Sequence, residues 1–147
     1  MKSIARNLLG NAADAEDAVQ NAFLKVYRGV AGFRGGCAFT TWVYRILVNS
    51  CYDLMRRNRR RAEAPLPEGI ALAAAPQPDH PLRLAIEAAL KRLEERERTA
   101  FLLCEVEGFS HREAAEILET SEGASRALLF KARRNLQRAL SHTGATP

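Results

Sequence analysis

The sequence contains no run of apolar residues approaching the roughly 18–20 that a membrane-spanning helix needs, although 47% of its 147 residues are hydrophobic. The amino-terminal end also lacks the apolar core of a secretory signal peptide. We therefore expect no membrane span and a cytoplasmic location.

Cysteine and histidine are scarce, with three residues of each. The cysteines form no CxxC pair and have no histidine at ligand spacing, so neither a zinc site nor a disulfide framework is predicted. The sequence shows no nucleophile–base pair and no phosphate-binding glycine loop. The acids Asp14, Glu16 and Asp17 lie too close together along the chain to suggest a hydrolytic metal site. We expect no enzyme, no metal and no cofactor.

Strand patterns are absent as well, since no segment alternates β-branched residues with polar ones. The predicted fold class is all-α. Five of the six prolines fall between Pro65 and Pro81, in an Ala-rich stretch with little to bury. This composition predicts two small helical domains, over 1–62 and 82–142, joined by a flexible linker over 63–81. Fully extended, the linker could span roughly 60 Å.

The amino-terminal half shows two amphipathic patterns. A helix starting near Asn11 or Asp14 repeats apolar residues at i, i+3 and i+4. We expect its buried stripe to hold Ala15, Ala18, Val19, Ala22, Phe23, Val26, Tyr27 and Val30. A second helix is predicted from about Phe39 to Arg60. Its expected buried stripe is Phe39, Val43, Ile46, Leu47, Ser50 and Leu54, and its expected polar face is Tyr44, Arg45, Asn49, Asp53, Arg56 and Arg57.

The carboxy-terminal half predicts four helices, over 82–92, 95–105, 110–118 and 122–140. Ser110 and Glu113 have the Ser-x-x-Glu spacing of a capping box. A tight turn over 119–121 then leads into a basic helix with Leu129, Ala132, Leu136 and Leu140 on its buried side. A short helix, a tight turn and a basic second helix are typical of a helix-turn-helix.

The charge distribution also indicates nucleic acid. Nine basic residues and a single acid, Asp53, lie between Ala18 and Ala62. No acid follows Gly123, whereas five basic residues do. Two basic helices separated by acidic segments favour a polyanion bound at two places over a merely solvated surface.

The motifs together resemble the sigma-70 family of bacterial RNA polymerase factors, and the size and organisation resemble its extracytoplasmic-function (ECF) subfamily. In the second half, the resemblance rests on the segments Glu97–Leu103, Glu107–Ser110, Ala114–Leu118 and Gly123–Leu136. In the first half they are Asp14–Phe23 and Phe39–Ile46, with Asn49 and the basic run 56–61. The resemblance covers nearly the whole chain outside the linker.

The resemblance implies a protein that binds core RNA polymerase and directs promoter recognition, DNA melting and initiation. The implied polymerase-binding residues are Asp14, Glu16, Asp17, Gln20 and Phe23. Those implied for the melted −10 element are Phe33, Trp42, Tyr44, Arg45, Asn49, Asp53, Arg56 and Arg57. Those implied for the duplex −35 element are Arg112, Ser125, Arg126, Lys131 and Arg134. An anti-sigma inhibitor is a further candidate partner.

Some of these residues have a second interpretation. Trp42 is as much a candidate for the core as for base stacking. The acids near Asp14 can also complement a helix dipole. Ser125 stands where the family usually has a buried Val, and Leu128 where it usually has a DNA-facing Arg. Because one bidentate Arg contact is worth about 1–3 kcal/mol of base discrimination, we expect altered −35 recognition. The chain also begins just before Ser3–Gly10, whereas the family normally has a further helix or so upstream. We therefore expect either a truncated start or a short helix before Gly10.

The main alternative is a helix-turn-helix regulator that works without polymerase. That alternative leaves the Trp42 helix and the acidic first helix without a role.

Overall fold

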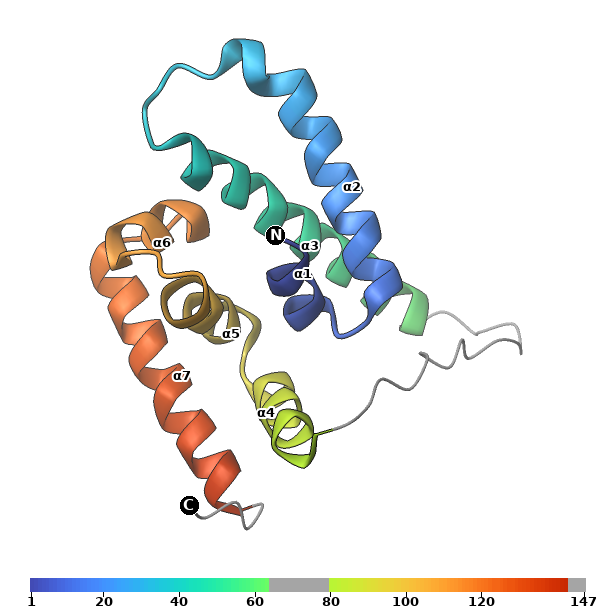
Figure 1. Ribbon diagram of the computed structural model, residues 1–147, viewed down its shortest axis with the longest axis vertical. Coiled ribbons are helices and arrows are strands. Elements are labelled where there is room, and N and C mark those ends of the chain that lie inside the picture. The colour runs from blue at the N-terminus through green and yellow to red at the C-terminus, as the bar shows by residue number, and fades with distance from the viewer. Residues whose placement is uncertain (64–79, 143–147) are drawn as a thin grey trace.

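The computed structural model describes residues 1–63 and 80–142, and these ranges are helical apart from short connections (Figure 1). The all-α prediction is confirmed for them. Most of the predicted linker lies outside the described residues. Within the described ranges, no helix is both long enough and apolar enough to cross a membrane.

The amino-terminal half consists of α1 (Lys2–Leu9), α2 (Ala12–Gly29) and α3 (Phe39–Glu63). Gly10, at φ 81°, ends α1 in the left-handed conformation that glycine adopts without strain. Asn11 caps α2, because its side chain accepts a hydrogen bond of 2.8 Å from the backbone N–H of Asp14. The predicted start of this helix at Asn11 is therefore confirmed. A short 3₁₀ turn (Val30–Gly32) follows α2.

The predicted buried stripe of α2 is only half right. Ala15, Ala18, Val19 and Ala22 pack into the core, as expected. The last two turns project beyond the rest of the molecule (Figure 1), so Phe23, Tyr27 and Val30 are exposed. Helical periodicity identified one apolar face, but it could not show that the neighbouring helices cover only part of its length.

The carboxy-terminal half comprises α4 (Pro81–Arg92), α5 (Glu95–Phe101), α6 (His111–Leu118) and α7 (Glu122–His142). A π-helical segment, Leu102–Val106, extends α5. The predicted capping box is present, with Ser110 Oγ accepting from the Glu113 N–H and the Glu113 carboxylate accepting from the Ser110 N–H. Glu119 makes the turn at a φ of 55°. The helix-turn-helix prediction is confirmed.

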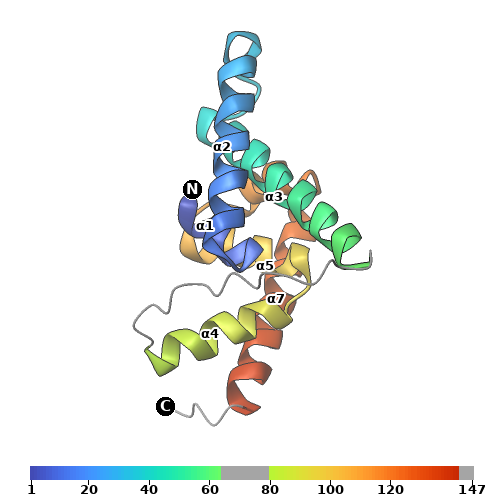
Figure 2. The same ribbon diagram turned by 90° about the vertical axis from the view of Figure 1, so that its right-hand side faces the viewer.

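The two halves share one continuous hydrophobic core. Buried residues from α1, α2 and α3 form a single cluster with buried residues from α4 to α7. Helix α1 contacts both α3 and α5, and α6 packs against α3. Figure 2 shows α4 and α7 on the side of this core away from the tip of α2. The sequence predicted two tethered domains but not this packing between them.

Candidate nucleic-acid interface

The polar face of α3 is partly covered by the carboxy-terminal half. Tyr44, expected on this exposed face, is only 9% exposed, and its predicted exposure is wrong. Its hydroxyl donates a 3.0 Å hydrogen bond to Glu107 Oε2, and its ring meets Phe109 edge-on at 4.9 Å. Burial, together with the Glu107 carboxylate, raises the pKa of Tyr44 to about 12. Tyr44 is therefore a contact between the two halves.

The loop before α3 forms a small pocket with the first turns of that helix. Phe33 and Trp42 lie 5.0 Å apart between ring centroids, and Phe39 packs on both rings. Phe33 and Trp42 line a pocket of about 460 Å³, together with Arg45 and, from α6, Glu116. The tip of the Trp42 ring reaches Gly29, where an added Cβ would lie 3.2 Å away. Trp42 thus has a packing role and a partly open ring face.

Further along α3, charges pair with one another. The Asp53 carboxylate accepts from Arg56 and lies 3.8 Å from Lys25 Nζ. Lys25 also donates to Ser50 Oγ at 3.3 Å. Lys25, Ser50 and Asp53 line a cleft of about 230 Å³ between α2 and α3. Arg56 and Arg57 are exposed, and Asn49 is half-buried. Asp53 therefore pairs with one cation of α3, Arg56, and lies close to one of α2, Lys25.

The proposed polymerase-binding residues of α2 divide into two groups. Asp14 is engaged inside the fold, because its carboxylate accepts hydrogen bonds from Asn11 and, at 3.0 Å, from Asn58 of α3. Glu16, Asp17 and Gln20 are exposed. Phe23 is 53% exposed.

Phe23 opens onto a shallow apolar depression of about 670 Å³, whose other lining residues are Gln20, Leu24, Val26, Tyr27 and Val30. The sequence predicted Gln20 and Phe23 as polymerase-binding residues, but it assigned Phe23, Val26, Tyr27 and Val30 to a buried stripe. It therefore missed the extent of this exposed surface. Tyr27, 82% exposed, is its most accessible aromatic side chain.

The recognition helix α7 needs one correction. Ser125 is fully buried, so its side chain is not a DNA contact. Leu128 is half-buried and packs against the core rather than facing DNA. Phe130, which sequence reasoning missed, is 67% exposed, and it lies one turn from Arg126 and one turn from Arg134. The only indication of this exposure in the sequence is that Phe130 does not share the helical spacing of the buried residues Leu129, Ala132 and Leu136.

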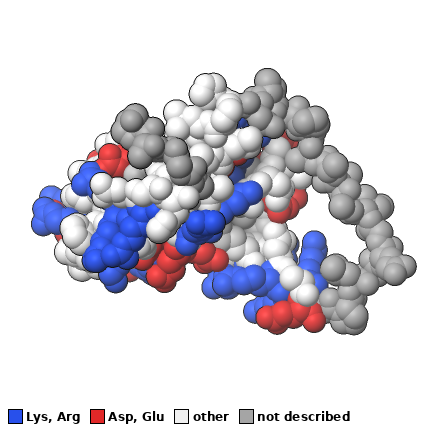
Figure 3. Space-filling view, turned by 90° about the horizontal axis from the view of Figure 1, so that it is seen from below, with Lys and Arg blue, Asp and Glu red and all other residues white. Residues whose placement is uncertain are grey.

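The remaining −35 candidates are exposed basic residues, namely Arg112 on α6 and Arg126, Lys131 and Arg134 on α7. Arg126 is paired with Glu122 at 2.7 Å. On the face of the molecule seen in Figure 3, Lys and Arg side chains alternate with acidic ones and form no unbroken basic field. An exposed aromatic ring among cations, on the second helix of a helix-turn-helix, suits the edge of a DNA groove.

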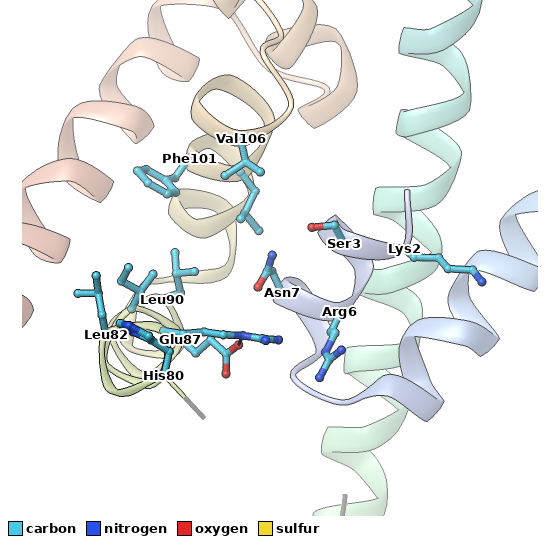
Figure 4. Close-up of a pocket in the computed structure, with 13 residues that line it drawn as sticks. Lys2, Ser3, Arg6, Asn7, His80, Leu82, Glu87, Leu90, Phe101 and Val106 are labelled. Atoms are coloured by element: carbon cyan, nitrogen blue, oxygen red, sulfur yellow. Dashed lines mark hydrogen bonds and ion pairs between the residues drawn. The ribbon is translucent and has the colours of Figure 1, made fainter. Parts of the chain in front are cut away.

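Another groove separates α1 from α4 and α5. Its volume is about 650 Å³. In Figure 4, Ser3, Arg6 and Asn7 of α1 lie across the groove from Leu82, Glu87 and Leu90 of α4, with Phe101 and Val106 beside them. Because its walls come from both halves, the groove exists only while the halves are packed together.

The helices of the described residues, with a helix-turn-helix and a second basic helix beside an aromatic loop, are typical of a DNA-binding transcription factor. Residues 1–61 match the family described as Sigma-70 region 2, and residues 83–136 match Sigma-70, region 4. The chain belongs to the sigma-70 family and, by its relatives, to the ECF subfamily.

The similar proteins agree with this assignment. The ECF sigma factor SigM of Mycobacterium tuberculosis is 33% identical over 95% of this chain and 70% of its own length. The sigma-H factor of Pseudomonas aeruginosa is 36% identical over 88% and 75%, respectively. The sigma-E factor of Escherichia coli K12 is 34% identical over 82% and 70%.

Two solved structures share the fold. The sigma factor RpoE in complex with the anti-sigma factor NepR, from Bartonella quintana, has a TM-score of 0.77 and 29% identity. It covers 95% of this chain and 89% of its own. CnrH in complex with the cytosolic domain of CnrY has a TM-score of 0.72 and 26% identity, covering 96% and 80%. The chain is therefore an RNA polymerase sigma factor, which acts in promoter recognition and transcription initiation and is not an enzyme.

Proposed function

We propose that each stage of initiation uses a different surface of this chain. Helix α2 binds core RNA polymerase, α3 with its preceding loop holds the melted −10 strand, and α7 reads the −35 duplex. The observation that carries the proposal is that these three surfaces differ in chemistry as their ligands do. The first is apolar with an acidic edge, the second aromatic and basic, and the third basic around one exposed ring.

The polymerase surface is the apolar depression of α2 together with the acids Glu16 and Asp17. Phe23 and Tyr27 expose large apolar areas that no neighbouring helix covers. Exposed apolar patches with a polar rim mark protein–protein contacts, and aromatic residues at their centre contribute most of the binding energy. Asp14 supports this surface from within, because its carboxylate accepts hydrogen bonds from Asn11, the cap of α2, and from Asn58 of α3.

The −10 surface combines the pocket at Phe33 and Trp42 with the cations Arg45, Arg56 and Arg57. Stacking an unpaired base on an aromatic ring is worth about 1–3 kcal/mol. Cations further along α3 neutralise phosphates and fix the position of the strand without reading its sequence. Tyr44 joins this surface only when the carboxy-terminal half moves away, because Glu107 and Phe109 contact it.

The −35 surface is the exposed face of α7. Arg126 and Arg134 can donate to base edges or phosphates, Lys131 to phosphates, and Arg112 to the backbone from α6. Phe130 supplies an apolar contact of the kind that recognises thymine methyl groups. Buried Ser125 and half-buried Leu128 contribute packing instead.

The groove between α1 and α4 is the proposed site for an anti-sigma segment. Its lining is largely apolar and also contains Lys2, Arg6 and the ion pair Arg83–Glu87. An amphipathic helix with acidic residues opposite Lys2 and Arg6 suits such a groove. The two similar structures were solved with anti-sigma proteins.

Acting with RNA polymerase also implies a cytoplasmic location.

Transcription in vitro with core polymerase, with and without this protein, tests the function. We expect specific initiation from some promoters of a genomic pool. Phe23→Ala should lower polymerase affinity at least tenfold. Leu82→Ala is the matched control, because Leu82 is also 53% exposed but lies on α4.

Polymerase capture without any specific transcript would contradict the initiation role. DNA binding without polymerase capture would favour the polymerase-independent regulator.

A further inference from the structure

Gly29, the last residue of α2, is a glycine that its backbone conformation does not require. It has φ −96° and ψ −12°, a conformation that residues with side chains also adopt. Gly10 and Gly35 differ, because their φ values of 81° and 75° strain any side chain. A glycine in a helix is also less stable than an alanine, since it loses more backbone entropy on folding. Local conformation therefore does not account for Gly29.

The space beside Gly29 is occupied by the ring of Trp42. A Cβ added at Gly29 would lie 3.2 Å from Trp42 Cζ2 and 3.5 Å from Trp42 Cη2. Two carbon atoms in favourable contact are about 3.5–4.0 Å apart, so the first of these separations is too short. A side chain at position 29 would therefore displace the ring.

The Trp42 ring cannot shift without changing the pocket in the loop before α3. Its backbone N–H donates to the Ala38 carbonyl oxygen at 3.1 Å, which fixes the main chain at the start of the helix. Its ring centroid lies 5.0 Å from that of Phe33 and 5.7 Å from that of Phe39. Phe33 and Trp42 line the same pocket. A displaced Trp42 ring therefore changes the arrangement of the two aromatic walls.

We infer that Gly29 is a positioning residue for −10 recognition: its missing side chain lets the Trp42 ring take the orientation in which an unpaired base stacks on it. The inference rests on the proposed role of Trp42 in the −10 surface. Stacking requires two flat faces at a defined separation and offset, so a small displacement of the ring weakens it. Gly29 lines neither the −10 pocket nor the apolar depression of α2, so it acts only through Trp42.

The test replaces Gly29 with alanine and, in a second variant, with valine. Alanine adds the Cβ alone, whereas valine adds two further methyl groups, so the displacement of Trp42 should increase from the first variant to the second. Gly123→Ala is the matched control. Gly123 also lies in a helix, α7, but a Cβ added there would meet nothing within 4 Å.

Fluorescence of the free protein measures the displacement. Trp42 is the only tryptophan of the chain, so the emission reports on this ring alone. A ring displaced from its packing position becomes more accessible to water. We therefore expect both Gly29 variants to emit at longer wavelength and to be quenched more strongly by acrylamide, and Gly123→Ala to match wild type. Circular dichroism checks that each variant folds.

The functional measurement uses the holoenzyme assembled with core RNA polymerase. We expect Gly29→Val to lower affinity for a −10 non-template oligonucleotide at least about fivefold, which is the loss of one weak base–aromatic stack. Gly29→Ala should lie between wild type and Gly29→Val, and Gly123→Ala should match wild type. Affinity for core polymerase should be unchanged in all three variants.

A second background shows whether Gly29 acts through Trp42. Trp42→Ala removes the ring that a side chain at position 29 would displace. Adding Gly29→Val to Trp42→Ala should therefore lower oligonucleotide affinity no further. A purely structural role of Gly29 would instead produce the same loss in both backgrounds.

Several results would overturn the inference. These are unchanged fluorescence in both Gly29 variants, a displaced ring with undiminished oligonucleotide affinity, or a loss that recurs without Trp42 or is matched by lost polymerase affinity. If Gly29→Val does not fold, Gly29→Ala decides by the same criteria. If Trp42→Ala itself binds the oligonucleotide as wild type does, the −10 role of Trp42 fails, and the fluorescence still decides whether Gly29 positions the ring.

Discussion

The Ser125 hydroxyl is fully buried and, among the described residues, has no hydrogen-bond partner. An unpaired buried hydroxyl retains most of its desolvation cost, which is about 1–3 kcal/mol. Ser121, four residues earlier, has the same side chain, but its hydroxyl has a hydrogen-bond partner. Its Oγ accepts a 3.1 Å hydrogen bond from the Ala124 N–H at the start of α7.

Replacing each serine with alanine should therefore have opposite effects. We expect Ser125→Ala to raise the free energy of unfolding by about 1 kcal/mol by removing an unpaired polar group. We expect Ser121→Ala to lower it by about 1 kcal/mol by removing a helix cap. Urea denaturation of both variants is the measurement. Equal changes of the same sign would show that the Ser125 hydroxyl has a partner.

Arg98 is a second residue whose role is decided by its surroundings. Its guanidinium donates to the backbone oxygens of Leu90 at 2.9 Å and Leu93 at 3.1 Å, where α4 ends, and to that of Leu8, where α1 ends. Burial lowers the pKa of Arg98. The carbonyls of Leu8 and Leu93 lie at helix ends, where intrahelical donors run out, whereas that of Leu90 also accepts from the Leu93 N–H at 3.2 Å.

Arg98→Met should lower the free energy of unfolding by about 2–3 kcal/mol, because it removes charge-assisted hydrogen bonds from several partly buried carbonyls. Arg98→Lys should recover less than half, since one ammonium cannot reach helix ends in two directions. Exposed Arg92→Met, at the end of α4, is the control and should change stability by less than about 0.5 kcal/mol. Thermal or urea unfolding distinguishes these outcomes.

At the scale of the element, α7 separates packing from recognition by helical period. Leu129, Ala132 and Leu136 face the core. Arg126, Phe130 and Arg134 follow one another at intervals of four residues on the exposed side. Leu128 lies between the two sets and is half-buried, so an arginine introduced there would have to leave the core edge before it could reach DNA.

Phe130→Ala should leave stability within about 0.5 kcal/mol of wild type, because the ring is largely exposed. It should weaken binding to a matched −35 duplex and reduce the preference for thymine at one position, by about 1 kcal/mol. Lys131→Ala should instead weaken all duplexes equally and reduce the salt dependence by about one ion. Fluorescence anisotropy at several salt concentrations measures both effects. Identical behaviour of the two variants would remove Phe130 from base recognition.

At the scale of the whole molecule, two buried groups, the Cys51 thiol and the Tyr44 hydroxyl, make the free energy of unfolding depend on pH in the alkaline range. Burial raises the pKa of the Cys51 thiol to about 12, and burial with Glu107 raises that of Tyr44 to about 12. Both groups are neutral when protonated, and their ordinary pKa values are 9.0 and 10.0. The stability that they contribute is complete below the ordinary values and is lost as pH rises towards 12.

We therefore expect the free energy of unfolding to fall between about pH 9 and pH 12, with a slope of at most about 1.4 kcal/mol per pH unit for each group. Tyr44→Phe should flatten the part above about pH 10 and leave the Cys51 part in place. Urea midpoints measured across this range give the slope. A Tyr44→Phe profile that matches wild type would show that Tyr44 ionises as readily in the folded as in the unfolded state.

Much of the candidate site could be predicted from local pattern. The capping box at Ser110, the start of α2 at Asn11 and the basic second helix of the helix-turn-helix each depend on residues a few positions apart. The exposure of Arg126, Lys131 and Arg134 also follows from the helical period. Such signals survive because helix formation and capping are local interactions.

What the sequence alone determined was therefore the set of helices, the helix-turn-helix and the family to which its motifs belong. Only the tertiary structure decided which apolar faces are covered. It left Phe23 and Tyr27 exposed, buried Tyr44 against Phe109, and brought Glu107 and Glu95 to α3. The physical reason is the separation in sequence between the residues that interact. Helical periodicity depends on neighbours along the chain, whereas coverage depends on contacts between residues of the two halves that are far apart in the sequence, such as Tyr44 and Glu107, whose separation is 63 positions.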